Sequence, residues 1–304
     1  MIIYTLLGIT LALALYSLYL IWKAGGRPLS AVLTYLLAGI SLGIFLYLYG
    51  TWVYLSVFTK YIFGGIFLLL LIRWILIRPV PGTVPPSRRK RFANVTFTIL
   101  VSVLNLLYFT GTTGSARTVE LSFPFHRGQY FVLQGGKGLP TNLFHFSLRG
   151  AIYAMDIVKL NTWGGRANKV FSKDLHDYEI FGDTIYAPCD GRVLHAYGGN
   201  PDNTPPNMNR GPKNTNHVLL ETDRYYVFMG HMKMYSVLVH DGQQVLKGQP
   251  LGCVGNSGFS TEPHLHIQAH LKEPGIEWYK SRPLYIHFDG RGFLLNDVIN
   301  ASTR

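Results

Sequence analysis

The stretch DGQQVLKGQPLGCVGNSGFSTEPHLHIQ, residues 241–268, decides the fold of the C-terminal part of the chain. Short apolar runs alternate there with Gly, Pro, Asn and Asp, which is typical of short strands joined by tight turns. His264 and His266 lie two residues apart, so a strand would place both imidazoles on one face of a sheet. Two adjacent imidazoles can bind a metal ion or transfer protons. Alone, a His-x-His pair is a weak signal, and a polar strand face is the simpler interpretation.

The same strand pattern extends over the sequence from Val119 to the C-terminus. No run in this region predicts a helix longer than two turns. The spacing therefore predicts an all-β domain of antiparallel sheets, either packed or closed like a barrel. A polar segment rich in Pro and Asn, residues 201–212, is a candidate wall or lid of a site. The predicted strands are residues 129–134, 184–186, 192–197, 217–222, 225–230, 236–240 and 264–270.

The N-terminal third is apolar and contains no acidic residue. Residues 1–119 hold 10 Lys and Arg and no Asp or Glu, whereas residues 120–304 hold 18 Lys and Arg against 16 Asp and Glu. About 20 apolar residues cross the hydrocarbon core of a membrane as a helix, and four stretches here approach that length. The predicted spans are residues 2–22, 30–57, 61–78 and 92–110. The predicted division is an anchor at 1–112, a linker with leading strands at 113–141 and a β domain at 142–304.

The positions of the basic residues predict the orientation of this anchor. Lys23 and Arg27 follow the first span, Arg78 and the run Arg88–Arg91 precede the fourth, and Lys60 lies alone between the second and third. The positive-inside rule then places the two richer loops in the cytoplasm and the β domain outside. The β domain itself is nearly neutral, which excludes a nucleic-acid partner bound through phosphates. A cleaved signal peptide is the poorer interpretation of the first span, because a basic n-region and a small-residue cleavage site are missing.

Three further motifs carry chemistry. His231 ends the apolar run YVFMGHM (226–232), Asp156 alternates with apolar residues in YAMDIV (153–158), and His145 lies in NLFHF (142–146). A buried carboxylate at Asp156 would have to be paired or bound to a metal, and a solvated strand face is the alternative. Cys189 and Cys253 are expected to be free thiols, since two cysteines do not make a disulfide framework.

Together these motifs resemble the lysostaphin-like zinc metalloendopeptidases, the peptidoglycan-cleaving enzymes with a LytM-type β-sheet domain. The order and spacing of the whole set are more specific than any single motif, and the resemblance covers about 125 residues, from about Asn142 to Gln268. The matching stretches are AMDIV (154–158), YAPCDGRV (186–193), NHVLL (216–220), MGHM (229–232) and the run from 241 to 268.

The resemblance implies a zinc site with three protein ligands and one open position, as in catalytic zinc centres. His217 matches a strand position of the family that is not a ligand, and it is expected to be structural. Asn142 or Tyr153 is expected to support the site. The implied ligands of Zn²⁺ are His145, Asp156 and His266, and the implied catalytic residues are His231 and His264.

The chain departs from the family pattern at the first ligand. In the family an early histidine commonly precedes the aspartate by four residues, and this chain has Ile152 there. His145 is the candidate at a longer gap, and His126 is the reserve. If neither reached the metal, the domain would be a degenerate one.

The expected function is that of a membrane-anchored zinc metalloendopeptidase that hydrolyses peptide bonds of cell-wall peptidoglycan. It would lie in the bacterial cell membrane as a multi-pass protein, with peptidoglycan peptides as substrate and the lipid bilayer as partner. The alternative is a metal-poor, non-catalytic domain that binds the cell wall or regulates another hydrolase. A structural zinc site usually has four ligands, often Cys, and the sequence GNSG around Ser257 does not match the nucleophile elbow of serine hydrolases.

Overall fold

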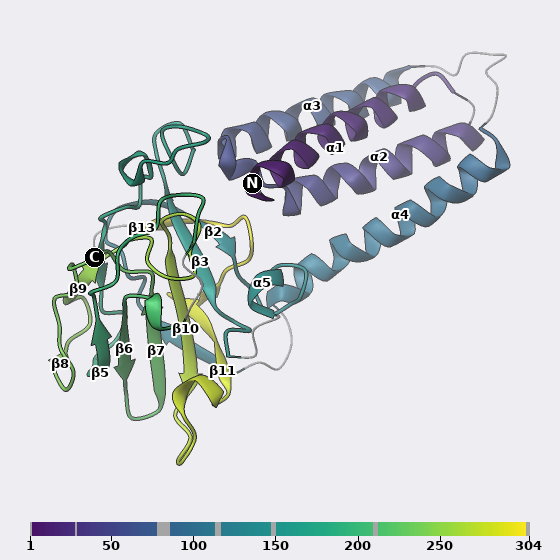
Figure 1. The fold of residues 1–304 in the computed structure, drawn as a ribbon. Coiled ribbons are helices and arrows are strands. Elements are labelled where there is room, and N and C mark those ends of the chain that lie inside the picture. Colours follow the sequence, from purple (N-terminus) through teal and green to yellow (C-terminus); the bar gives the residue numbers. More distant parts are fainter. Residues whose placement is uncertain are drawn as a thin grey trace. The chain divides into compact units, whose positions relative to one another are not determined.

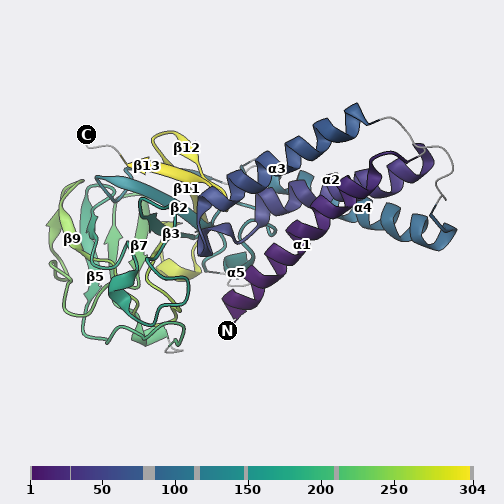
Figure 2. The ribbon, with the colours of Figure 1, turned by 90° about the horizontal axis from the view of Figure 1, so that it is seen from above.

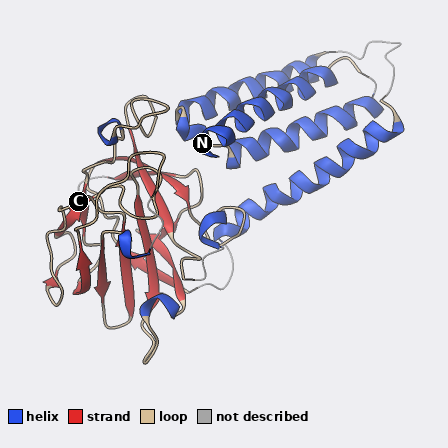
Figure 3. Cartoon of the chain, viewed as in Figure 1, coloured by secondary structure: helices blue, strands red, loops and turns tan. Residues whose placement is uncertain are grey.

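The computed structural model describes residues 2–27, 29–77, 86–112, 117–146, 150–208 and 212–301 (Figure 1). The chain divides into two compact units, Met1–Phe109 and Thr110–Arg304. The first unit is helical, and the second is made of strands and loops (Figure 3). The predicted order of apolar N-terminal helices followed by a β-sheet domain is therefore confirmed.

The first unit contains the helices α1 (Ile2–Ala24), α2 (Leu29–Tyr49), α3 (Val57–Leu76) and α4 (Arg88–Phe109). Within the described residues, three of them, α1, α3 and α4, are long and apolar enough to cross a membrane. The apolar stretch of α2, Thr34–Tyr49, is shorter. Of the basic residues used to predict the orientation, Arg78 lies outside the described residues.

The second predicted span, residues 30–57, is wrong at its C-terminal end. Helix α2 ends at Tyr49, a short 3-10 turn covers Trp52–Tyr54, and α3 begins at Val57. The Ser56 hydroxyl accepts a hydrogen bond from the backbone N–H of Phe58, which caps α3 at its N-terminus. The cap and the 3-10 turn thus divide an apolar run that hydropathy alone joins.

Polar side chains of α4 face α2. The Asn94 amide donates to the carbonyl of Thr34 at 3.0 Å, and the Asn105 amide donates to the carbonyl of Ser41 at 2.9 Å. Helix α1 packs against both α2 and α3, and α2 also packs against α4 (Figure 2). The polar residues of the fourth predicted span are therefore used between helices, as is common for polar residues in membrane helices.

The second unit contains a large sheet in the order β13-β2-β3-β10-β7-β6-β5-β8, to which β11 adds β1 and β12, and a two-stranded sheet of β4 and β9. The described pairs are antiparallel except for β1 and β11, which pair in parallel. The strands are β1 (Thr118–Leu121), β2 (Gly128–Gln134), β3 (Met155–Leu160), β4 (Thr184–Tyr186), β5 (Gly191–Tyr197), β6 (His217–Glu221), β7 (Tyr225–Gly230), β8 (Gln244–Val245), β9 (Pro250–Cys253), β10 (Leu265–Leu271), β11 (Pro283–Phe288), β12 (Arg291–Gly292) and β13 (Val298–Ala301).

Six of the seven predicted strands are present, and the seventh, residues 236–240, is not a strand. The Ser236 hydroxyl accepts from the backbone N–H of Cys253 and donates to the carbonyl of Lys233, so a side chain takes the place of a ladder bond. A single backbone bond, from Leu238 to the carbonyl of Leu251, joins this segment to β9. Hydroxyl groups compete with strand pairing in this way.

The central strands β3, β10 and β7 position the candidate site. Ile157, Ile267 and Val227 point into the hydrophobic core and are fully buried. Because successive side chains of a strand point to opposite faces, their neighbours Asp156 and His266 lie on the other face. The same alternation that builds the core therefore gathers polar groups on one surface of the sheet.

Candidate metal centre and active site

Three predicted ligands come together on the polar face of the sheet. Asp156 of β3 and His266 of β10 are register partners, and Oδ1 of Asp156 lies 3.0 Å from Nδ1 of His266. His145 comes from the short helix α5 (Leu143–Phe146), and its Nε2 lies 3.3 Å from Oδ2 of Asp156. One ligand atom from each residue lies within 4.8 Å of the others.

Both histidines of this cluster have their second ring nitrogen bonded to an amide oxygen. Nδ1–H of His145 donates to Oδ1 of Asn142 at 2.8 Å, and Nε2–H of His266 donates to Oε1 of Gln268 at 3.0 Å. The orientation of the Asn142 amide is fixed, because its Nδ2 donates to backbone carbonyls such as that of Ala154. In these tautomers the other nitrogen of each ring faces Asp156 as an acceptor, which is the form that binds a metal ion.

The two predicted catalytic histidines adjoin the cluster. Nδ1–H of His264 donates to the backbone carbonyl of Glu262 at 2.8 Å, and its Nε2 lies 3.5 Å from Oδ1 of Asp156. Nδ1–H of His231 donates to the carbonyl of Ser257 at 2.8 Å, and its ring centre lies 4.7 Å from that of His264. Each of these rings also keeps an unprotonated Nε2.

The donor set fits a divalent metal ion such as Zn²⁺. Unprotonated imidazole nitrogens and carboxylate oxygens are all acceptors, so they repel one another at short distance unless a cation lies among them. The separations of 3.0 Å and 3.3 Å match adjacent ligands of a tetrahedral zinc ion, which are about 3.3 Å apart for bonds of about 2.0 Å. Two histidines and one aspartate leave one tetrahedral position for water or substrate.

The protein environment shifts the pKa values of these groups in different directions. Burial, together with the charges of His264 and His266, holds the pKa of His231 well below its usual range. Burial also lowers the pKa of His266, but its hydrogen bond to Asp156 and the charge of that group outweigh burial and raise it. Burial raises the pKa of Asp156, but the charges of His145 and His264 outweigh it and hold it well below the usual value. A neutral His231 thus stands beside an ionised carboxylate.

His231 has a backbone conformation that non-glycine residues rarely adopt. Its φ is +64°, in the left-handed region. The backbone N–H of Gly255 donates to the carbonyl of His231 at 2.9 Å, and the N–H of Met232 donates to the carbonyl of Asn216 at 3.0 Å. These bonds hold the turn after β7, which directs the imidazole toward the cluster. Strained residues of this kind are common at functional sites.

Sequence reasoning missed a buried ion pair that includes Glu262, the residue whose carbonyl bonds His264. The Arg166 guanidinium contacts the Glu262 carboxylate through Nε at 2.9 Å and Nη2 at 2.8 Å, and both side chains are almost fully buried. Glu262 also supplies the carbonyl that accepts from His264. The only signal in the sequence is a carboxylate two residues before His264; nothing there identifies Arg166, 96 residues away.

A row of stacked rings lies beside the cluster. His195 stacks on His217, His217 on Phe228, and Phe228 on Trp278, with ring centres 5.0 to 5.2 Å apart. Phe228 also meets the edge of His266 at 6.1 Å. His217 belongs to this row and not to the metal cluster.

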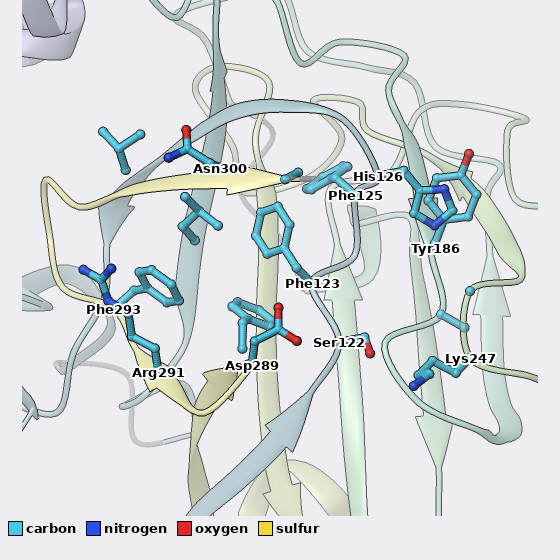
Figure 4. Close-up of a pocket in the computed structure, with 16 residues that line it drawn as sticks. Ser122, Phe123, Phe125, His126, Tyr186, Lys247, Asp289, Arg291, Phe293 and Asn300 are labelled. Atoms are coloured by element: carbon cyan, nitrogen blue, oxygen red, sulfur yellow. The ribbon is translucent and has the colours of Figure 1, made fainter. Parts of the chain in front are cut away.

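The structure does not bring the reserve ligand His126 to the cluster. His126 lies face to face with Tyr186, with ring centres 3.6 Å apart (Figure 4). Both line a pocket of about 610 Å³ whose walls also include Phe123 and Phe125, and none of the clustered histidines lines it. This pocket is thus separate from the polar face that carries Asp156.

The remaining predicted features are distributed around the site. Tyr153 packs against the edge of Tyr285, so of the two expected supporting residues only Asn142 bonds a clustered histidine in the described residues. Cys189 and Cys253 are free thiols, as expected, and burial raises the pKa of Cys189 to about 11.

The described part of the 201–212 segment is fixed to the loop before β10. Asp202 accepts from the backbone N–H of Asn256, and the Asn203 amide donates to the carbonyls of Gly258 and Ser260. Residues 209–211 of this segment lie outside the described residues. Its action as a lid stays a prediction.

Comparison with known proteins gives one family. Residues 176–277 match Peptidase family M23, and this region includes His231, His264 and His266 but neither His145 nor Asp156. Over 93 residues, or 30% of the chain, the sequence is 32% identical to an uncharacterized metalloprotease of Haemophilus influenzae. The matched region spans only 16% of that protein.

Solved structures of M23 peptidases show weaker similarity. The catalytic domain of the prophage-encoded M23 protein EnpA from Enterococcus faecalis is 20% identical, over 43% of this chain and 72% of that one, with a TM-score of 0.28. The catalytic domain of lysostaphin from Staphylococcus simulans is 17% identical, over 54% and 86%, with a TM-score of 0.27. The similarity that carries weight is therefore the sequence match of residues 176–277 to Peptidase family M23.

Proposed function

We propose that this chain is a membrane-anchored zinc endopeptidase that hydrolyses peptide bonds of peptidoglycan. One observation carries the proposal. Four histidines each have one ring nitrogen bonded to an amide or backbone oxygen; the other nitrogens of His145, His264 and His266 approach a single carboxylate, Asp156, and the ring of His231 lies against those of His264 and His266. A metal ion at this point would take the place of the proton that otherwise joins Nδ1 of His266 to Asp156, and it would satisfy the surrounding acceptors together.

Zinc, when bound, supplies a Lewis acid that makes water nucleophilic near neutral pH and polarises a peptide carbonyl. His145, Asp156 and His266 would hold it. His231 and His264 are not among the three ligands, and each bonds a backbone carbonyl through Nδ1, which leaves Nε2 for proton transfer. One of them accepts the proton of the attacking water, and the other, once protonated, stabilises the negative charge that develops on the carbonyl oxygen.

The zinc content of the purified full-length chain tests the ligand set. We expect about one zinc per chain by elemental mass spectrometry, and loss of zinc in His145→Ala and in His266→Ala. His270→Asn is a matched control, because His270 is also a buried histidine of β10 but bonds to Ser281 instead of the cluster. Retention of zinc in His266→Ala, or no zinc after zinc is offered back, would contradict the proposed site. A zinc-free domain would support a non-catalytic binding module.

Hydrolysis of cross-linked peptidoglycan fragments tests the reaction. We expect cleavage by the wild-type chain and a loss of about 10²- to 10⁴-fold in His264→Ala with zinc retained, since general acid–base groups contribute in this range. If the wild-type chain binds zinc and cleaves an unrelated peptide but leaves wall peptides intact, the result would support peptidase activity and contradict peptidoglycan as the substrate.

The same proposal places the M23 domain outside the cytoplasm. Helix-to-helix contacts support an arrangement in which Lys23 and Lys90 share one end of the helical unit, because both approach Tyr35, while Lys60 approaches Tyr47 at the other end of α2. In a chain whose free thiols Cys189 and Cys253 are replaced by Ser, an impermeant maleimide should label Lys60→Cys in intact cells and Lys90→Cys only after permeabilisation. The reverse result would invert the orientation.

A further inference from the structure

The helical unit concentrates cations around one aromatic ring. The ring of Tyr35 on α2 is approached by Lys23 of α1 at 5.3 Å, by Arg27 after α1 at 5.3 Å, and by Lys90 of α4 at 5.4 Å. These three cations around Tyr35 are the basic cluster. Because all three lie within about 5.4 Å of one centre, no two of them are more than about 11 Å apart.

The geometry of the basic cluster is fixed by contacts within the helices. Arg27 Nε donates to the carbonyl of Lys23 at 2.8 Å, and Lys23 Nζ donates to the hydroxyl of Tyr19 at 2.8 Å. Tyr35 itself is buried between the helices, with 4% of its surface exposed. The cations are therefore held near a rigid aromatic ring, which offers each of them part of a cation–π contact.

The cluster has no counter-charge in its own part of the chain. Residues 1–119 contain no Asp or Glu, so no carboxylate of the helical unit can neutralise it. A cation–π contact contributes about 0.5–2 kcal/mol and does not remove the repulsion among three like charges. Arg73, near the C-terminal end of α3, adds a fourth cation over Trp22, and its Nη1 is buried without a hydrogen-bond partner in the described residues. An anion with several acceptor oxygens would satisfy these groups together.

We infer that the basic cluster binds the phosphate group of an anionic membrane lipid. The position of the cluster agrees with this ligand, because it lies where α1 ends and where α2 and α4 begin, at one end of helices long enough to span a bilayer. Lipid headgroups lie at that depth, and Lys or Arg side chains near the surface attract anionic lipids. Tyr19 and Tyr35, which contact these cations, match the aromatic belt of the membrane interface. The site is independent of the peptidase reaction.

Lipid titration of the full-length chain in neutral detergent tests this inference. The probes are phosphatidylglycerol, phosphatidylcholine and inorganic phosphate, and the readouts are bound lipid by native mass spectrometry and the temperature of unfolding. We expect binding of phosphatidylglycerol in preference to phosphatidylcholine. Each of Lys23→Gln, Arg27→Gln and Lys90→Gln should weaken it about fivefold, and the triple variant about a hundredfold.

Lys60→Gln is the matched control, since Lys60 lies 4.6 Å from the ring of Tyr47 as a single cation. It should change the affinity less than twofold. Wild-type affinity in the triple variant, or an equal loss in Lys60→Gln, would overturn the inference. If inorganic phosphate stabilises the chain as much as phosphatidylglycerol does, the inference of a lipid ligand would be overturned, and the basic cluster would be a site for a free anion. If the triple variant does not fold, the three single variants decide, because each is expected to show a fivefold effect.

Discussion

Asp156 and His266 lie directly opposite each other in the β3–β10 pair, although they are 110 residues apart in the sequence. The adjacent register pair, Ile157 and Leu265, is fully buried in the core. Because side chains alternate between the two faces, a slip of one residue would move either Asp156 or His266 into the core. The hydrophobic pattern of the two strands therefore fixes the distance between the two proposed metal ligands.

Replacement of Asn142 should weaken metal binding without changing a ligand. In Asn142→Ala the His145 ring loses its partner at Nδ1, and we expect a 10- to 100-fold lower zinc affinity, as is usual for groups that orient metal-bound histidines. Competition with a chromogenic chelator measures this affinity. Asn142→Asp keeps an acceptor for His145 but loses the donor to the Ala154 carbonyl, so it should retain more affinity than the alanine variant. Equal loss in both variants would contradict an orienting role.

The Arg166–Glu262 pair should behave as a buried ion pair that holds the loop before β10. Removal of one partner, in Arg166→Met or Glu262→Leu, leaves an unpaired buried charge and should reduce the free energy of unfolding by about 3–5 kcal/mol. The double variant removes both charges and should recover most of that loss.

Denaturation of the two single variants and of the double variant gives the coupling energy of the pair. Additive losses would show that the two side chains do not depend on each other. Hydrogen exchange of the peptide that contains His264 should increase in the single variants, because the Glu262 carbonyl accepts from that ring.

Much of the β domain can be predicted from local pattern. Residues 184–186 and 225–230 are strands with the predicted ends, because apolar alternation and flanking turn residues both act within a few positions. The parallel pairing of β1 with β11 could not be predicted, since its partners are separated by more than 160 residues and neither strand carries a signal for direction. The break between α2 and α3 was missed for a different reason, because a serine cap does not lower the hydropathy of a window.

The candidate site, like the fold, could be predicted from the sequence only in part. The motifs predicted which side chains would gather, because His264, His266 and His231 lie at the ends or on one face of recognisable strands. His145 was harder to assign, since it reaches Asp156 from a separate one-turn helix, and only the fold determines whether that helix approaches β3. Arg166 was invisible because a buried guanidinium is recognised by its partner and not by its neighbours in the sequence.

Acid should destabilise the row of stacked rings, because His217 lies in that row and takes up a proton at low pH. Burial, and secondarily the charge of His195, lowers the pKa of His217 below its ordinary value near 6.5, although the Thr215 carbonyl opposes this. The unfolded chain then binds a proton more readily than the folded chain, so stability is lost as pH falls through about 6.5 and the loss is complete below the folded pKa. Protonation also removes the Nε2 acceptor that receives Nδ1–H of His195.

His217→Asn should therefore lose less stability than the wild type between about pH 7 and pH 5, since it retains an amide donor for Thr215 and does not titrate. Hydrogen exchange of β6 and β7 peptides at each pH measures this difference. Parallel pH curves for the two proteins would exclude His217 as the titrating group.

Two substitutions of His231 should separate its chemistry from its backbone conformation. His231→Gly and His231→Ala both remove the imidazole and its bond to the Ser257 carbonyl, so both should reduce peptide hydrolysis by about 10²- to 10⁴-fold. Only glycine adopts a φ of +64° without strain, so the glycine variant should be more stable than the alanine variant by about 1 kcal/mol. Thermal or chemical unfolding of the two variants measures the difference. Tyr235, exposed and with a φ of +57°, is a matched control: Tyr235→Gly should exceed Tyr235→Ala in stability by a similar amount while hydrolysis continues. Equal stability of His231→Ala and His231→Gly, together with a difference between Tyr235→Ala and Tyr235→Gly, would show that the turn relaxes in His231→Ala. The left-handed backbone conformation would then not be needed to hold the imidazole beside His264.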